Sequence, residues 1–89
     1  MNQGVLAPPS NSPFPINELD TVVLTRDLAE HGLERGDIGT VAHRYRDGAA
    51  LEVEFVTGEG ETVAVLTLKD EEVRLMRNGE ILHARERAA

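Results

Sequence analysis

Four residues with metal-ligating or charged side chains lie in one short stretch: Asp27, Glu30, His31 and Glu34. On a helix they would occupy positions i, i+3, i+4 and i+7, which share one face, and a histidine beside carboxylates is a donor set for a divalent metal. Gly32 interrupts such a helix, and no second histidine lies nearby in the sequence. We therefore expect a solvated acidic loop that contacts a partner, and keep a metal- or small-molecule-binding domain as an alternative.

A second candidate set consists of charged residues that alternate with apolar ones on two predicted strands: Arg44, Arg46, Glu52 and Glu54. An Asp-Gly pair separates these strands, and it is a strong signal for a tight hairpin. The hairpin would bring the two outward faces side by side, so that cross-strand charge pairs can form. Solubility alone explains such a surface, because exposed ion pairs contribute little stability. The functional alternative is a charged sheet face that contacts a partner.

Nucleophiles and cofactor sites are scarce in this sequence. The chain contains no cysteine, which excludes disulfides, thiolate zinc sites and iron–sulfur centres. Its two serines, Ser10 and Ser12, lie among prolines, where nothing holds a base against them. No catalytic triad, phosphate-binding loop or paired-carboxylate motif is present. We therefore expect a protein that is not an enzyme and binds no cofactor.

Charge and proline content divide the chain into three parts. Residues 1–17 hold all four prolines and no charged side chain, which predicts a flexible, disordered tail that docks at its end through Phe14 and Ile16. Residues 18–76 form the folded part of this 89-residue chain, whose length suits a single domain. Residues 77–89 are predicted to form an edge segment, either a sixth strand or a short helix. If the segment is free instead, its apolar pair Ile81-Leu82 would be a docking peptide or a dimer contact.

The apolar residues of the folded part recur with a period of two, which is typical of half-buried strands. Residues 50–56 alternate apolar side chains with glutamates. Val41, His43 and Tyr45 share one face of the preceding stretch, which predicts a partly buried histidine. The expected strands are residues 21–25, 39–46, 50–56, 62–68 and 73–76.

Five short strands with a long first loop, tight hairpins and a one-turn connector before the last strand predict an all-β fold. The expected architecture is a small five- to six-stranded antiparallel SH3-like barrel. An OB-like barrel is the alternative, although it usually has longer strands and a helix between the third and fourth. Gly36 and Gly39 are expected where the backbone needs a positive φ or a close approach.

Three stretches cover nearly all of the chain outside the proline-rich tail: ELDTVVLTRDLAEHGLERGDIGTVAHRY (residues 18–45), DGAALEVEFVTGEGETVAVLTLKDEEVR (residues 47–74) and EILHARE (residues 80–86). Their order resembles an uncharacterised family of small bacterial SH3-like domains, a domain of unknown function. The resemblance implies an SH3-like β-barrel without assigned catalytic residues. It also implies a small accessory protein, for which an antitoxin-like or regulatory role is the hypothesis.

The net charge of the chain indicates which charge the expected partner carries. The chain carries −7 overall and the folded part −8, because 14 acidic residues stand against 6 basic ones there. This acidity predicts a basic protein partner and disfavours nucleic acid, so a nucleic-acid-associated SH3-like module is kept only as an alternative. No apolar run is long enough to span a membrane, and we expect a cytoplasmic protein without membrane contact. A homodimer formed through a sheet edge is a further expectation.

Overall fold

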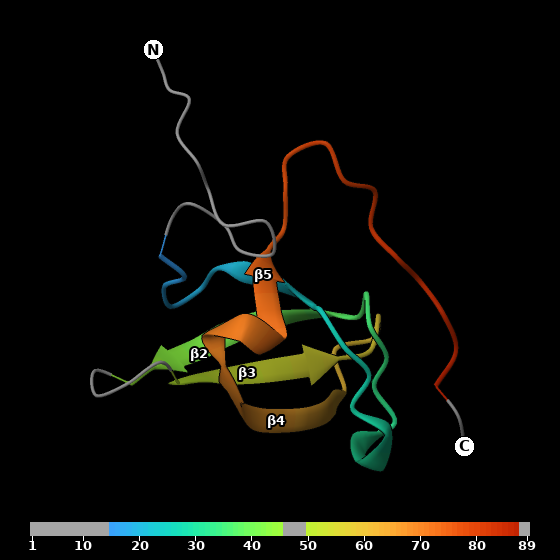
Figure 1. The fold of residues 1–89 in the computed structure, drawn as a ribbon. Helices are drawn as coiled ribbons and strands as arrows, with labels where there is room; N and C mark the ends of the chain where they lie inside the picture. Colours follow the sequence, from blue (N-terminus) through green and yellow to red (C-terminus); the bar gives the residue numbers. More distant parts are fainter. Residues whose placement is uncertain (1–14, 46–49, 88–89) are drawn as a thin grey trace.

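The computed structural model describes residues 15–45 and 50–87, which form one antiparallel sheet with the spatial order β4-β3-β2-β1-β5 (Figure 1). The elements are β1 Thr21–Leu24, η1 Ala29–His31, β2 Ile38–Arg44, β3 Ala50–Val56, β4 Thr62–Lys69, η2 Asp70–Glu72 and β5 Val73–Leu75, where η marks a 3₁₀ turn. The predicted all-β class is confirmed, and the order is compatible with a small SH3-like fold. The sheet stays open, because no pairing between described residues joins β4 to β5.

Strand β2 takes part in two hydrogen-bonded ladders. Its second half pairs with β3, from Thr40 opposite Glu54 to Arg44 opposite Leu51. Its first half pairs with β1, and Thr40 belongs to both ladders because it also lies opposite Thr21. The sheet is bent, since Figure 1 shows β5 standing steeply across the direction of β2 and β3, and the two ladders meet at Thr40.

The core lies on the inner face of the bent sheet. The alternation predicted for β3 is confirmed, since Leu51, Val53 and Phe55 are buried and the glutamates between them are not. Ile16, at the end of the predicted tail, is also buried in this core, whereas Phe14 lies outside the described residues. The remaining buried core residues are Val22, Leu24, Leu28, Leu33, Val41, Leu68 and Val73.

The two glycines singled out in the sequence fill the two roles expected of them. Gly36 has a φ of +95°, a conformation that side chains rarely adopt. Gly39 lies in the bend of β2, where an added Cβ would come within 2.7 Å of Val53 Cγ1 and 2.9 Å of Phe55 Cε1. The bend thus requires a residue without a side chain, because β2 presses directly onto the core side chains of β3.

The prediction for His43 is wrong, because a β-bulge interrupts β2. The register shifts between Val41 and His43, so one extra residue exchanges the inner and outer faces of the strand. Val41 is buried, whereas His43 and Tyr45 are exposed. The His43 ring contacts Tyr45 edge-on and places Nδ1 at 3.0 Å from the Glu18 carboxylate.

The C-terminal segment, residues 77–87, is neither the sixth strand nor the short helix that the sequence predicted. Residues 81–87 have no regular secondary structure. Among the described residues, they take part in no hydrogen bond between two backbone groups. In Figure 1 it runs from β5 back along one side of the domain. The predicted Asp-Gly hairpin turn lies outside the described residues. Within the described ranges, no helix has the length and apolar character needed to cross a membrane.

Gly39→Ala is expected to destabilise the fold by about 1–3 kcal/mol, because the added methyl group overpacks the core against Val53 and Phe55. Urea unfolding followed by far-UV circular dichroism measures this change. Gly58→Ala is the matched control, since nothing lies within 4 Å of a Cβ built there and its φ is not positive. Equal stability of the two variants would show that the close approach at Gly39 does not constrain the bend.

Candidate binding groove

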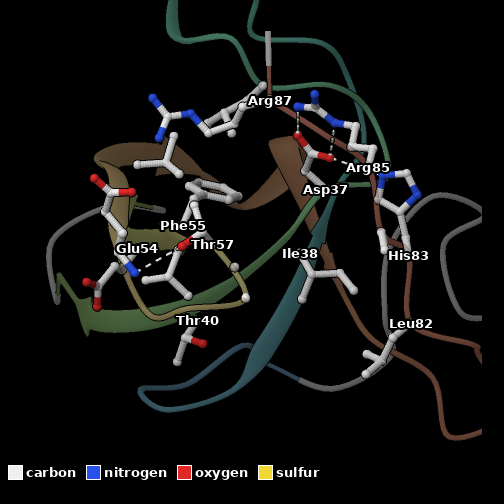
Figure 2. Close-up of a pocket in the computed structure, with 17 residues that line it drawn as sticks. Asp37, Ile38, Thr40, Glu54, Phe55, Thr57, Leu82, His83, Arg85 and Arg87 are labelled. Carbon is white, nitrogen blue, oxygen red and sulfur yellow. Dashed lines mark hydrogen bonds and ion pairs between the residues drawn. The ribbon is translucent and has the colours of Figure 1, made fainter. Parts of the chain in front are cut away.

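A groove opens where β2 and β3 separate. Beyond the Thr40–Glu54 pair, Ile38 pairs only with β1, whereas Val56 pairs only with Thr62 of β4. The two strands therefore diverge, and the space between them is bounded on its other side by the C-terminal segment. The groove has a volume of about 710 Å³ and is drawn in Figure 2.

Apolar side chains from both walls form most of the groove's lining. Phe55 and Leu33 are buried core residues that reach its floor. Val56 lies half exposed on the sheet side, and Leu82 is 71% exposed on the side of the C-terminal segment. A ligand that covers these residues would remove apolar surface from water, and that burial is the main favourable term in association.

The sheet-side wall is acidic. Glu54 and Glu61 both line the groove, and the Glu54 carboxylate accepts a hydrogen bond of 2.8 Å from the Thr62 hydroxyl. Thr57 fixes the hairpin between them, because its Oγ1 accepts a hydrogen bond of 3.1 Å from the Glu61 amide. Among the described residues, no arginine or lysine nitrogen lies within 4.0 Å of either carboxylate.

The opposite wall is held in place by Asp37, a buried carboxylate that is 8% exposed. Arg85 binds it through two parallel hydrogen bonds, from Nε to Oδ1 at 2.9 Å and from Nη2 to Oδ2 at 2.5 Å. The same guanidinium donates to the Gly32 carbonyl at 2.9 Å. Figure 2 shows the Arg85 guanidinium facing Asp37, with His83 beside them. One carboxylate thus fastens the C-terminal segment to the loop between β1 and β2.

Further contacts complete the surroundings of Asp37. Its Oδ2 accepts a hydrogen bond of 2.8 Å from the Glu34 amide, and His83 Nε2 lies 3.2 Å from Oδ1. Burial alone would raise the pKa of Asp37, but the hydrogen bonds from Arg85 and Glu34 outweigh it and hold the pKa below its ordinary value. The carboxylate is therefore ionised, and its negative charge compensates the Arg85 guanidinium.

A second ion pair anchors the start of the C-terminal segment. Arg74 of β5 binds the Glu80 carboxylate through two hydrogen bonds, of 2.8 and 2.6 Å, and the Arg77 amide donates a third of 2.6 Å. These hydrogen bonds lower the pKa of Glu80 from 4.5 to about 2. The segment is thus held at two points by arginine–carboxylate pairs, which are stronger than neutral hydrogen bonds.

The structure does not gather the first predicted site. The turn Ala29–His31 ends at Gly32, whose φ is +70°, so the shared helical face does not form. Asp27 accepts a hydrogen bond of 2.8 Å from the Arg35 amide and so fixes the loop. Glu30 is exposed, and only Glu34 approaches the groove, with its carboxylate 3.6 Å from Arg85 Nε. Nowhere in the described ranges do three or more histidine or acidic residues form a group that could hold a metal.

The second predicted set is divided between different contacts. Arg44 binds Asp70 with two hydrogen bonds, of 3.2 and 2.9 Å, instead of pairing with a glutamate of β3. Glu52 accepts hydrogen bonds from the Thr67 hydroxyl at 2.7 Å and the Tyr45 hydroxyl at 3.2 Å. The hydrogen bond to the Glu52 carboxylate, together with its negative charge, raises the pKa of Tyr45. Arg46 lies outside the described residues. Of this set, only Glu54 lines the groove.

Sequence reasoning missed the residues that build the second wall. Asp37 and Arg85 are 48 residues apart, and no short motif connects positions at that separation. The available signals were a lone acid beside the apolar residues of β2 and the basic pattern His-Ala-Arg-Glu-Arg near the end of the chain. Neither signal identifies its partner without the fold.

A family model described as Domain of unknown function (DUF4926) matches residues 18–75, a range that contains all five strands. No curated protein and no solved structure matches the chain. The matched range includes Asp37 and the acidic wall of the groove, whereas His83 and Arg85 follow it.

Acidification is expected to remove the stability that Glu80 contributes. Because its pKa is lowered on folding, this contribution is complete above the unfolded value of 4.5 and is lost as the pH falls towards about 2. Urea unfolding across that range should show a weaker pH dependence for Glu80→Gln than for the wild type. Glu71→Gln, at an exposed position within the 3₁₀ turn η2, is the control. A Glu80→Gln curve parallel to the wild type would contradict the assignment.

Asp37→Asn is expected to destabilise the fold by about 1–3 kcal/mol and to release residues 82–87, because Arg85 loses its paired carboxylate. The backbone ¹⁵N heteronuclear NOE of these residues should fall, while that of β3 stays unchanged. Glu34→Gln serves as the control, since it removes a carboxylate near Arg85 and leaves the Asp37 ion pair intact. An unchanged NOE in Asp37→Asn would show that other contacts hold the segment.

Proposed function

The chain belongs to the DUF4926 family of domains of unknown function, and we propose that it is a non-enzymatic protein-binding module that receives an extended, basic segment of a partner protein. The site is the groove between the diverging ends of β2 and β3 and the C-terminal segment. The observation that carries this proposal is the combination of an apolar floor with an acidic wall in one open groove. Phe55 of the floor and Glu54 of the wall both belong to β3, a strand with neighbours on both sides in the sheet.

The shape of the groove favours an extended ligand. It is bordered lengthwise by a strand end and hairpin on one side and by residues 82–87 on the other. Among the described residues, the backbone of this second border takes part in no backbone–backbone hydrogen bond, and of its polar groups the Glu86 carbonyl accepts a hydrogen bond from the Arg85 side chain. The other amides and carbonyls can therefore pair with a ligand backbone. Extended peptides bind other proteins in this way, through main-chain hydrogen bonds with alternate side chains in pockets.

The charge distribution favours a basic ligand. Several arginines of the described residues are already paired with carboxylates: Arg26 with Glu72, Arg44 with Asp70, Arg74 with Glu80 and Arg85 with Asp37. Of the charged residues that line the groove, Arg85 is paired with Asp37, and the carboxylates of Glu54 and Glu61 outnumber the one remaining arginine, Arg87. A lysine or arginine of the ligand would meet these carboxylates and be steered to them from a distance. The same carboxylates would repel the phosphates of a nucleic acid.

Binding is favoured over catalysis by the state of the polar groups in the groove. Asp37 and His83 lie next to each other, as an acid–base pair would. Both oxygens of Asp37, however, accept hydrogen bonds from Arg85, and its pKa is lowered. A carboxylate held ionised in this way is a weak general base at neutral pH, since an effective base has a pKa near the working pH. Asp37 therefore serves to hold the wall of the groove and is poorly suited to accept a proton.

Selection from a display library of random peptides tests the proposal and requires no identified partner. Enriched peptides are expected to combine lysine or arginine with apolar residues at alternate positions. A synthetic peptide of the most enriched sequence should bind the double variant Glu54→Lys/Glu61→Lys at least about tenfold more weakly than the wild type. Added salt should weaken wild-type binding, because the attraction is electrostatic in part.

The control is the double variant Glu30→Lys/Glu71→Lys, which changes the net charge by the same amount at exposed positions that do not line the groove. It should retain wild-type affinity, and circular dichroism should show both double variants folded. Enrichment of acidic peptides, or of none, would contradict the proposal. Loss of binding in the control alone would place the site near Glu30 or Glu71 instead of in the groove.

A further inference from the structure

The β-bulge in β2 turns two rings towards solvent, and we propose that these rings and a neighbouring carboxylate bind an arginine side chain of a protein partner. Tyr45 is 41% exposed, and its ring centroid lies 4.7 Å from that of His43, at an interplanar angle of 81°. Bulges are frequent next to functional sites, where they reorient side chains. Phe55 is buried in the core and Phe14 lies outside the described residues. Tyr45 is therefore the exposed aromatic residue of the described part of the chain.

Glu52 lies beside the two rings on the same face of the sheet, because it is opposite His43 in the ladder between β2 and β3. Its Oε1 accepts hydrogen bonds from the Tyr45 hydroxyl at 3.2 Å and from the Thr67 hydroxyl at 2.7 Å. No other hydrogen bond or ion pair with a described residue engages the Glu52 side chain. Two donors thus hold the carboxylate in place, and its Oε2 is open to a further donor.

The charges around the rings favour a cationic ligand. Glu18 Oε2 lies 3.0 Å from His43 Nδ1, so a second carboxylate borders the pair. Glu54 follows Glu52 at the next outward position of β3. Lys69, at the end of the neighbouring strand β4, forms no ion pair with a described carboxylate. Carboxylates therefore outnumber the lysine around this patch, and an incoming cation is attracted to it.

Arginine suits this arrangement better than lysine does. Its planar guanidinium stacks on the face of an aromatic ring and donates N–H groups in its own plane to a carboxylate. The Tyr45 hydroxyl fixes Glu52 at one end of the ring, so a guanidinium on the ring would have the open oxygen of Glu52 beside it. Since ring and carboxylate are already held together, binding costs little ordering of the protein.

This arginine site is separate from the groove. Glu18, His43, Tyr45 and Glu52 do not line the groove, so a test of the site does not depend on what the groove binds. Tyr45 is the single tyrosine of the chain, which contains no tryptophan. Tyrosine fluorescence therefore reports on this site alone.

A fluorescence titration at constant ionic strength tests the proposal. The probe is the blocked peptide acetyl-Gly-Arg-Gly-amide, and the matched neutral probe carries citrulline in place of arginine. The arginine peptide is expected to change the tyrosine emission in a saturable way, with a dissociation constant in the millimolar range. The lysine peptide should bind more weakly, and the citrulline peptide should leave the emission unchanged.

Variants are compared through the backbone amide shifts of Glu52 and Thr67, because Tyr45→Leu removes the fluorophore. Tyr45→Leu should weaken binding of the arginine peptide about fivefold, whereas Tyr45→Phe keeps the ring and should stay closer to the wild type. Glu52→Gln should weaken it about tenfold, since it removes the charged acceptor. Glu59→Gln is the matched control and should bind like the wild type, because it makes the same charge change at an exposed position in the hairpin at the other end of β3.

A wild type whose emission stays constant, or changes equally with the arginine and citrulline peptides, would overturn the proposal. So would a Tyr45→Leu variant that binds as tightly as the wild type. Equal affinity for the lysine peptide would overturn the choice of arginine. Arg46 follows Tyr45 in the sequence and lies outside the described residues. Binding seen only in an Arg46→Gln variant would show that the chain's own arginine fills the site, and would overturn the role of a partner.

Discussion

The membership of β2 in two ladders is the constraint from which the rest of the structure follows. One half of the strand pairs with β3 and the other with β1, and the sheet bends where the two ladders meet at Thr40. The bend places the inner faces of the two halves around one core, and it is close enough that only glycine fits at Gly39. The same bend separates β2 from the end of β3. Both the core and the groove therefore lie where β2 changes its pairing partner from β1 to β3.

The groove gains its second wall from side-chain ion pairs and not from secondary structure. Residues 82–87 make no backbone hydrogen bonds with other described residues, and their position depends on Arg85 bound to Asp37. A buried charge is costly unless it is paired. Arg85 therefore stabilises the buried Asp37 carboxylate, and the same ion pair holds the segment in position. A wall attached in this way can move apart from the sheet, because few cooperative contacts oppose its local opening. Ligand binding and segment order are thus linked.

The sequence allowed prediction of those features whose cause is local. Strand β3 was predicted correctly because its alternation is unbroken, and the all-β class follows from several such stretches. The burial of His43 was predicted incorrectly, because a bulge exchanges the faces of a strand without changing its composition. The predicted cluster at residues 27–34 needed a helix that Gly32 ends. The ion pair of Asp37 and Arg85 joins positions 48 residues apart, a separation on which local spacing gives no information.

The central claim is that the C-terminal segment lies along the groove opposite the end of β3. The chain contains no cysteine, so Ala84→Cys offers a single attachment point for a nitroxide label at a residue that lines the groove. Paramagnetic relaxation enhancement of the backbone amides then measures which residues lie near the segment. The structure predicts strong broadening of residues 56–58 in the labelled protein, and its loss when Asp37→Asn is added. Weak, uniform broadening in the labelled protein would show that the segment lies elsewhere, and would contradict the groove as described.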